Sequence, residues 1–178
     1  MRKFRMIAAA ALAVLFVAAC TSPSGSKPSA APGAATATPH RTTVPAQLQF
    51  TAKTVDGQDF SGQSLLGKPA VLWFWAPWCP VCQGEAPMVG RMATAHPAVR
   101  FVGVAGLDRL PAMQQFVAKY PVNGFTHLAD TDGSVWAKFD VTHQPAFAFI
   151  RPDGGISVVK GDLSEPDLDQ RVTVLTQP

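Results

Sequence analysis

The chain has 178 residues and a formal charge of +3, and its first 46 residues are dominated by Ala, Pro, Ser and Thr. Residues 47–178 are therefore expected to form one domain of ordinary size. They carry ten Lys and Arg against all 12 Asp and Glu, which gives this part a formal charge of −2. Because nucleic-acid binding depends on clustered cations that displace phosphate counterions, this balance argues against a nucleic-acid-binding domain.

The N-terminus has the pattern of an export signal. Three cations in residues 1–5 precede 14 apolar residues, 6–19, and the run ends in Val17-Ala-Ala-Cys20. As a helix, 14 residues span about 21 Å, less than the roughly 30 Å hydrocarbon core, so a transmembrane helix is the weaker interpretation. We expect residues 1–19 to be a signal peptide and the protein to be extracytoplasmic. The Val-Ala-Ala-Cys ending resembles a bacterial lipobox, which implies lipidation of Cys20 and attachment to the cell membrane. The alternative is ordinary cleavage nearby, which would leave a free thiol and a secreted protein.

Residues 20–46 are expected to be a linker. Five prolines occur there among Ser, Thr, Ala and Gly, with almost no large apolar side chain before Val44. Such a segment cannot bury enough apolar surface to offset the entropy cost of ordering it. As a flexible chain it would hold the domain roughly 25–30 Å from a membrane.

The domain, residues 47–178, is expected to contain a βαβ unit. Ala70–Trp75 is a continuous apolar run, typical of a central strand buried on both faces. A second apolar run at residues 101–105 follows at a spacing that suits a parallel crossover through a helix covering Pro80–Ala95. Upstream, residues 48–53 alternate between apolar and polar like a half-buried strand.

Further elements complete the predicted domain. Pro111 in a first helical turn and Pro121 as a stop predict a helix between them. The turn at residues 153–155 predicts an antiparallel hairpin, and Ser164 with Asp167 predicts the start of a last helix. The predicted elements are a helix with Leu110, Met113, Phe116, Val117 and Tyr120 on one face, a short helix at 134–139, a hairpin of 146–151 and 156–160, and a helix with Leu168, Val172 and Leu175 along one stripe. This pattern predicts an α/β fold with a central mixed β-sheet flanked by helices.

Cys79 and Cys82 form a Cys-x-x-Cys motif where the predicted central strand passes into the predicted helix. The first sulfur should lie at the helix N-terminus, where unpaired backbone N–H groups and the helix dipole stabilise a thiolate. Cys82 lies about one helical turn further on and can attack a mixed disulfide formed at Cys79. Pro80 suits the first turn because it has no N–H to lose. We therefore expect Cys79 to attack and Cys82 to resolve in thiol–disulfide exchange.

Three other interpretations of the pair are weaker. A structural disulfide between residues three apart would gain little loop entropy. A zinc site would need two more ligands, and only His127 and His143 are plausible additions. A cysteine peroxidase of this fold would place Thr or Ser three residues before the reactive cysteine, where this chain has Ala76. We expect neither a metal nor a cofactor.

The segment Phe74-Trp-Ala-Pro-Trp-Cys-Pro-Val-Cys-Gln-Gly-Glu-Ala-Pro87 resembles the active-site segment of thioredoxin-fold proteins of the TlpA/ResA/DsbE-like group. The shared pattern is Trp-Cys-x-x-Cys-x-x-Glu-x-Pro. Together with the lipobox, the linker and residues 68–75, it is most similar to the secreted actinobacterial DsbE/DsbF-like lipoproteins. The resemblance covers residues 47–178 and implies a thioredoxin fold and thiol–disulfide exchange.

The same resemblance implies a cis-proline that faces the dithiol, and the matching position is Pro145. In this group the proline backbone helps to align a partner polypeptide beside the sulfurs and keeps metals away. The preceding residue, often Thr or Val, is Gln144 here, which affects partner selectivity. We expect partner proteins to contact Gln144 and Pro145 together with Trp78, Pro80 and Val81. The alternatives are a trans proline that only starts a strand and a packing role for Trp78.

Two further residues are candidates for proton transfer. Cytosolic thioredoxins carry a buried Asp six residues before the first cysteine, but this chain has Trp73 and no carboxylate relay at that position. Glu85 matches the glutamate of the group and could move protons around Cys82; the alternative is a helix acid held by a local partner. His143 could approach the dithiol and stabilise its thiolate; the alternative is a solvated loop histidine.

The direction of electron flow is less determined than the reaction type. Related proteins span roughly −270 to −120 mV, which is about 7 kcal/mol. Pro80-Val81 is not the Gly-Pro of reducing thioredoxins, position 73 lacks the acid, and the compartment is oxidising. We therefore predict an oxidant of cysteines in exported proteins that works with a membrane redox partner. The alternatives are a reductase of the cytochrome c maturation type and a copper-binding scaffold that uses Cys79, Cys82 and a histidine.

Overall fold

A five-stranded mixed sheet lies at the centre of the structure, a computed structural model that describes residues 43–177. The strand order is β5-β4-β3-β6-β7. Strands β3 and β4 are parallel, as are β4 and β5, whereas β6 is antiparallel to both β3 and β7. The strands are β3 (Ala70–Trp75), β4 (Arg100–Gly106), β5 (Thr126–Asp130), β6 (Ala146–Ile150) and β7 (Ile156–Lys160). The expected signal peptide, Cys20 and most of the expected linker lie outside the described residues.

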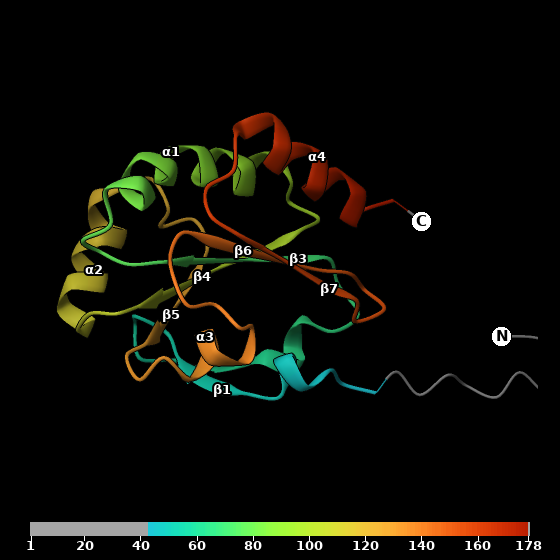
Figure 1. Ribbon diagram of the computed structural model, residues 1–178, viewed down its shortest axis with the longest axis horizontal. Helices are drawn as coiled ribbons and strands as arrows, with labels where there is room; N and C mark the ends of the chain where they lie inside the picture. The colour runs from blue at the N-terminus through green and yellow to red at the C-terminus, as the bar shows by residue number, and fades with distance from the viewer. Residues whose placement is uncertain (1–42, 178) are drawn as a thin grey trace, which may run out of the picture. The chain divides into compact units, whose positions relative to one another are not determined.

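Helices cover both faces of this sheet (Figure 1). Helices α1 (Pro80–Ala95), α2 (Leu110–Lys119) and α4 (Glu165–Leu175) lie on one face, which we call the α1 face. The opposite face, called the α3 face, carries the short helix α3 (Ser134–Lys138). It also carries the hairpin of β1 (Thr51–Lys53) and β2 (Asp59–Ser61) and the 3-10 turns η1 (Ala46–Leu48) and η2 (Gly62–Leu65).

The central strand β3 supplies both cores. All six of its residues are buried, and alternate side chains point to opposite faces. Trp73 and Trp75 enter the core of the α1 face, whereas Leu72 and Phe74 enter the core of the α3 face. The unbroken apolar run at this position is therefore a requirement of burial on both sides, as predicted.

The helix of the βαβ unit has the predicted bounds. Cys79 is the N-cap of α1, Pro80 occupies its first turn, and Pro87 lies inside it. The predicted hairpin is present as β6 and β7, and Ser164 caps α4 by accepting a hydrogen bond from the Asp167 N–H. Sequence periodicity was sufficient here because each of these elements buries a regular apolar face.

The structure differs from the sequence-based expectation near the N-terminal part of the domain. Of the strand expected at residues 48–53, only Thr51–Lys53 is extended, because Leu48 closes a 3-10 turn and fills the α3-face core from there. Val44 already packs against that core. Strands β2 and β5 were not predicted, and Leu110 of the predicted apolar face is exposed.

Among residues 43–177, no helix combines the length and hydropathy that crossing a bilayer requires.

Candidate active site at the start of helix α1

The two cysteines lie together at the N-terminus of α1, and both are free thiols. Cys79 Sγ accepts a hydrogen bond from the Cys82 N–H at 3.2 Å, so this sulfur satisfies one of the unpaired donors of the first helical turn. Cys82 Sγ lies 2.6 Å from Cys79 Sγ. Cys79 is 4% exposed and Cys82 is fully buried, so an approaching thiol reaches Cys79 first. A sulfur that caps a helix is placed where negative charge is favoured.

Cys82 resists ionisation in this position. Burial raises the pKa of the Cys82 thiol above its ordinary value, and its hydrogen bond with Cys79 raises it further. A hydrogen bond with the Ala76 backbone acts in the opposite direction, while the charges of Cys79 and Glu85 add to the rise in the Cys82 pKa. The resolving thiol therefore needs a nearby group that takes its proton.

A buried carboxyl group lies next to Cys82. Glu85 follows Cys82 by three residues on α1, which places both side chains on the inward face of the helix. The carboxylate accepts the Trp73 indole N–H at 3.0 Å and the Leu163 backbone N–H at 3.3 Å. Burial raises the pKa of Glu85 from 4.5 to about 7, although both hydrogen bonds lower it. Position 73 thus has no acid, as the sequence shows, but its indole holds an acid from the helix.

Strand β6 begins at the same end of the sheet. Ala146 of β6 pairs with Phe74 of β3, so Pro145 lies one position beyond, beside the chain that leads to Cys79. The Gln144–Pro145 peptide bond is cis, as the resemblance implies, and Pro145 is buried. Gln144 remains partly accessible.

Exposed apolar side chains surround the dithiol. Trp78 is 54% exposed, and its indole N–H donates to the Leu107 carbonyl at 3.1 Å. Val81 and Leu107 are about half exposed, and Leu107 has a φ of 58°. This left-handed conformation is strained for a leucine. A hollow of about 270 Å³ opens beside Trp78, between α1 and α2. The four residues Trp78, Val81, Leu107 and Pro145 are called the rim below.

Within residues 43–177, His127 and His143 lie in two separate places. Among the described residues, no three or more His, Cys, Asp or Glu side chains gather where they could hold a metal ion. His127 is buried on the α1 face, where its Nε2 bonds with the Val122 carbonyl at 2.8 Å. His143 is exposed, and its Nδ1 lies 3.3 Å from the Thr142 hydroxyl.

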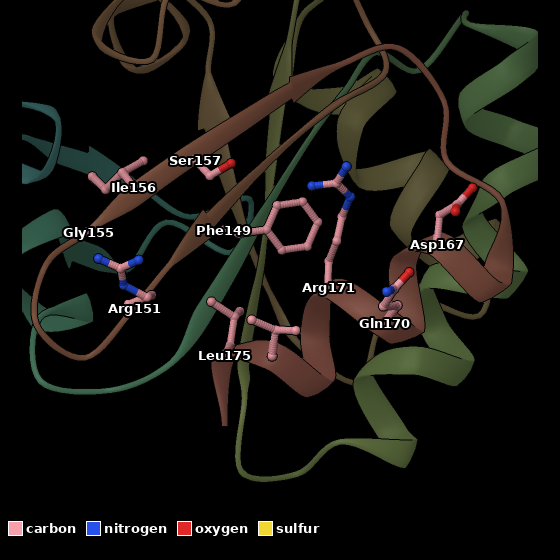
Figure 2. A pocket seen from close by; sticks show the side chains of 10 residues that line it. Phe149, Arg151, Gly155, Ile156, Ser157, Asp167, Gln170, Arg171 and Leu175 are labelled. Atoms are coloured by element: carbon pink, nitrogen blue, oxygen red, sulfur yellow. The ribbon is translucent and has the colours of Figure 1, made fainter. Parts of the chain in front are cut away.

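A larger cavity, of about 510 Å³, lies between β6, β7 and α4 (Figure 2). It reaches Phe149 and Arg151, at the end of β6 remote from the dithiol. Its guanidinium groups are already engaged: Arg151 pairs with Asp153 at 3.2 Å, and Arg171 lies over the Phe149 ring at 5.6 Å. This cavity is separate from the dithiol site.

Comparison with known proteins agrees with this geometry. A family model described as "AhpC/TSA family" matches residues 44–159. The chain belongs to this family. It is 50% identical to the soluble secreted antigen MPT53 of Mycobacterium tuberculosis over 142 residues, which are 78% of this chain and 82% of the relative. It is 30% identical to the thiol-disulfide oxidoreductase ResA of Bacillus subtilis over 119 residues, 65% of this chain and 66% of that protein.

Solved structures show the same similarity. The structure of MTB dsbF in its mixed oxidized and reduced forms is 71% identical, with a TM-score of 0.75, and covers 75% of this chain and 100% of that one. A secreted Mycobacterium tuberculosis disulfide oxidoreductase homologous to E. coli DsbE is 50% identical, with a TM-score of 0.69, over 72% of this chain and 97% of that one. This AhpC/TSA member therefore has the expected thioredoxin fold and is a thiol–disulfide oxidoreductase.

The structure adds site residues that sequence analysis missed. Trp73 was interpreted as the loss of an acid, and the Leu163 N–H and Leu107 received no role. Leu163 lies 78 residues from Glu85, so no local pattern could connect the two. For Leu107, the sequence offered one signal: an apolar residue directly after the apolar run that forms β4. The peroxidase interpretation gains no residue from the family match, because position 76 is a buried alanine.

Proposed function

We propose that this protein oxidises pairs of cysteines in exported proteins, with Cys79 as the attacked and attacking sulfur and Cys82 as the resolving sulfur. The observation that carries the proposal is the position of Cys79 Sγ: it caps α1 at 3.2 Å from the Cys82 N–H, with Cys82 Sγ behind it at 2.6 Å. A stabilised Cys79 thiolate is a good leaving group, which favours the dithiol form of the protein and makes its disulfide form an oxidant.

The reaction is two successive thiol–disulfide exchanges. A client thiolate attacks Cys79 Sγ of the disulfide form, the Cys79–Cys82 bond breaks, and Cys82 leaves as a thiolate that takes up a proton. A second client thiolate attacks the client sulfur of the mixed disulfide and releases Cys79. The two client thiols lose two electrons and two protons, and the Cys79–Cys82 pair gains them. A membrane redox partner must then reoxidise the dithiol.

Glu85 supplies or accepts the proton of Cys82 in this proposal. Its carboxyl is buried three residues away on the same helix face, and its pKa of about 7 keeps both protonation states populated at neutral pH. The hydrogen bonds from Trp73 and Leu163 that hold the carboxyl are compatible with this proton-transfer role. For His143, stabilisation of the thiolate stays a prediction. Its side chain is exposed in the loop before β6.

Client binding is assigned to the rim together with the adjacent Pro80 and Gln144. An extended client segment that carries its cysteine to Cys79 would lie against Gln144 and Pro145 on one side, and against Pro80, Val81 and Trp78 on the other. The exposed apolar area of Trp78, Val81 and Leu107 favours clients that are still unfolded, because such chains present apolar side chains beside their cysteines.

Attachment to the membrane through a lipid on Cys20 belongs to the same proposal. The apolar run and the Val-Ala-Ala-Cys ending support it, and an anchor would keep the dithiol near a membrane redox partner. Detergent-phase partitioning tests it: Cys20→Ala should move the protein to the aqueous phase and leave its redox activity unchanged. Aqueous partitioning of the unaltered protein would indicate a secreted form.

Catalysed refolding of a reduced multi-cysteine protein tests the redox proposal. The full chain in its disulfide form should accelerate recovery, and both Cys79→Ser and Cys82→Ser should abolish the effect because neither can form the Cys79–Cys82 disulfide. With a client that carries a disulfide, Cys82→Ser should accumulate a mixed disulfide, because its Cys79 attacks the client disulfide and no second thiol resolves the product. The reduction potential separates the oxidant from the reductase, because a value below about −250 mV would contradict the oxidant. The Glu85 carboxylate beside Cys82 would serve either direction, so this measurement decides between them.

A further inference from the structure

The contacts of Glu85 come from two elements distant in the sequence. The Trp73 indole N–H on β3 donates to Glu85 Oε2 at 3.0 Å, and the Leu163 N–H, in the segment before α4, donates to Oε1 at 3.3 Å. Trp73 is completely buried, and Glu85 is 7% exposed. Each carboxyl oxygen thus has one donor inside the protein, and the carboxyl orientation is fixed from two sides.

These two donors act against the cost of burial. Burial favours the neutral carboxylic acid, whereas a donated N–H favours the carboxylate. Without the donors, the pKa of Glu85 would rise further, and a smaller fraction of the carboxyl groups would be ionised and able to accept a proton from Cys82 at neutral pH. Of the two donors, only the Trp73 N–H belongs to a side chain. It can therefore be removed by substitution.

We propose that Trp73 is a positioning residue of the redox site: its indole N–H orients the Glu85 carboxylate and favours its ionised form, so that Glu85 can accept the Cys82 proton during resolution. The proposal rests on the proton-transfer role given to Glu85 in the proposed function. In this role Trp73 acts only through Glu85.

Trp75 provides a matched control on the same strand. Its ring is stacked on Trp73 with centroids 5.7 Å apart, and both indoles are fully buried in the α1-face core. Unlike Trp73 Nε1, Trp75 Nε1 has no hydrogen-bond partner among the described residues. Replacing either Trp by Phe removes similar apolar volume, but only Trp73→Phe removes a donor from Glu85.

The reaction of the reduced full chain with excess dithiobis(nitrobenzoate) separates the two cysteine steps. Attack of Cys79 on the reagent releases the first coloured thiolate at a rate proportional to the reagent concentration. Cys82 then attacks the mixed disulfide at Cys79, releases the second thiolate and passes its proton to Glu85, at a rate independent of the reagent concentration. The pH profile of this second phase reports the proton acceptor.

The second phase of the unaltered protein should have an inflection near pH 7, and Glu85→Gln should remove it. Loss of one hydrogen bond to a carboxylate should move this inflection upward by about one pH unit in Trp73→Phe, which slows the second phase about fivefold at pH 7. The first phase should not change. Trp75→Phe should leave the second-phase inflection in place even where it lowers stability by as much as Trp73→Phe.

An unmoved inflection in Trp73→Phe, or an equal shift in Trp75→Phe, would overturn the proposal. So would a second phase of the unaltered protein that has no Glu85-dependent inflection. The test is independent of clients: if refolding of reduced proteins is not catalysed but the inflection shifts as expected, the oxidant function fails and the role of Trp73 stands.

Discussion

The two faces of the sheet each bury one carboxyl group, and the two groups are held differently. Asp130, on the α3 face at the end of β5, accepts backbone N–H groups of Val135 at 3.0 Å and Trp136 at 2.8 Å. These donors lie five and six residues away in the chain. Glu85, on the α1 face, is held by donors 12 and 78 residues away and lies beside a thiol.

This difference shows how the same chemical group serves two purposes. Asp130 closes a local turn by satisfying the first N–H groups of α3, which is a structural use of a carboxylate. Glu85 accepts hydrogen bonds from elements distant in the sequence, and its charge raises the pKa of Cys82. Burial raises the pKa of both groups, so a raised pKa alone does not distinguish them. The neighbours do.

The largest expected effect is the difference in client oxidation between a substitution at the dithiol, on the α1 face, and a substitution at Asp130, on the α3 face. Cys82→Ser should lower client oxidation roughly a thousandfold or more, because Cys79 alone cannot hold the oxidising disulfide. Asp130→Asn should leave client oxidation unchanged in protein that is still folded. Refolding rates and mass spectrometry of trapped mixed disulfides measure this, and comparable losses in both variants would contradict the division between the faces.

Glu85 should impose a pH dependence on stability. Its folded pKa of about 7 exceeds the unfolded 4.5, so the folded state binds the extra proton, and stability is full below pH 4.5 and lost as the pH rises through 7. In Glu85→Gln, the loss of unfolding free energy between pH 4.5 and about pH 8 should be about 3 kcal/mol smaller. Urea unfolding at both pH values checks this. The buried His127, whose pKa is lowered to about 4 by burial, acts in the opposite direction and is common to both proteins.

Asp130→Asn should lower stability by about 2 kcal/mol at neutral pH, because the amide group cannot accept both backbone N–H bonds at the start of α3. Both phases of the dithiobis(nitrobenzoate) reaction should be preserved. Thermal or urea unfolding provides the first measurement. A change in the second phase would mean that the α3 face also contributes to proton transfer.

The smallest effect is expected at the rim. Leu107→Gly relieves a φ of 58° and removes an exposed side chain, so stability should not fall. Client oxidation should slow roughly fivefold, since about 1 kcal/mol of apolar contact is lost. Reaction with a small disulfide should not change. Equal effects on client and small disulfide would show that Leu107 acts on the chemistry and not on docking.

Much of the fold follows from local patterns. The buried run of β3, the caps of α1 and α4 and the hairpin turn before β7 each depend on residues a few positions apart, and these elements were predicted near their observed bounds. The short strands β2 and β5 were missed because they carry polar residues whose burial depends on neighbours. His127 of β5 is one, and Gly103 opposite it is needed because a Cβ there would collide with His127 and Trp75.

The sequence by itself determined the reactive pair, since a Cys-x-x-Cys between a buried strand and a helix defines its own geometry within a single turn. Only the tertiary structure decided what surrounds that pair. The contacts of Glu85 with Trp73 and Leu163, and of Trp78 with Leu107, join segments brought together by packing of the whole sheet and its helices. The proton affinity of a buried group depends on such desolvation and donors, which no spacing along the chain encodes.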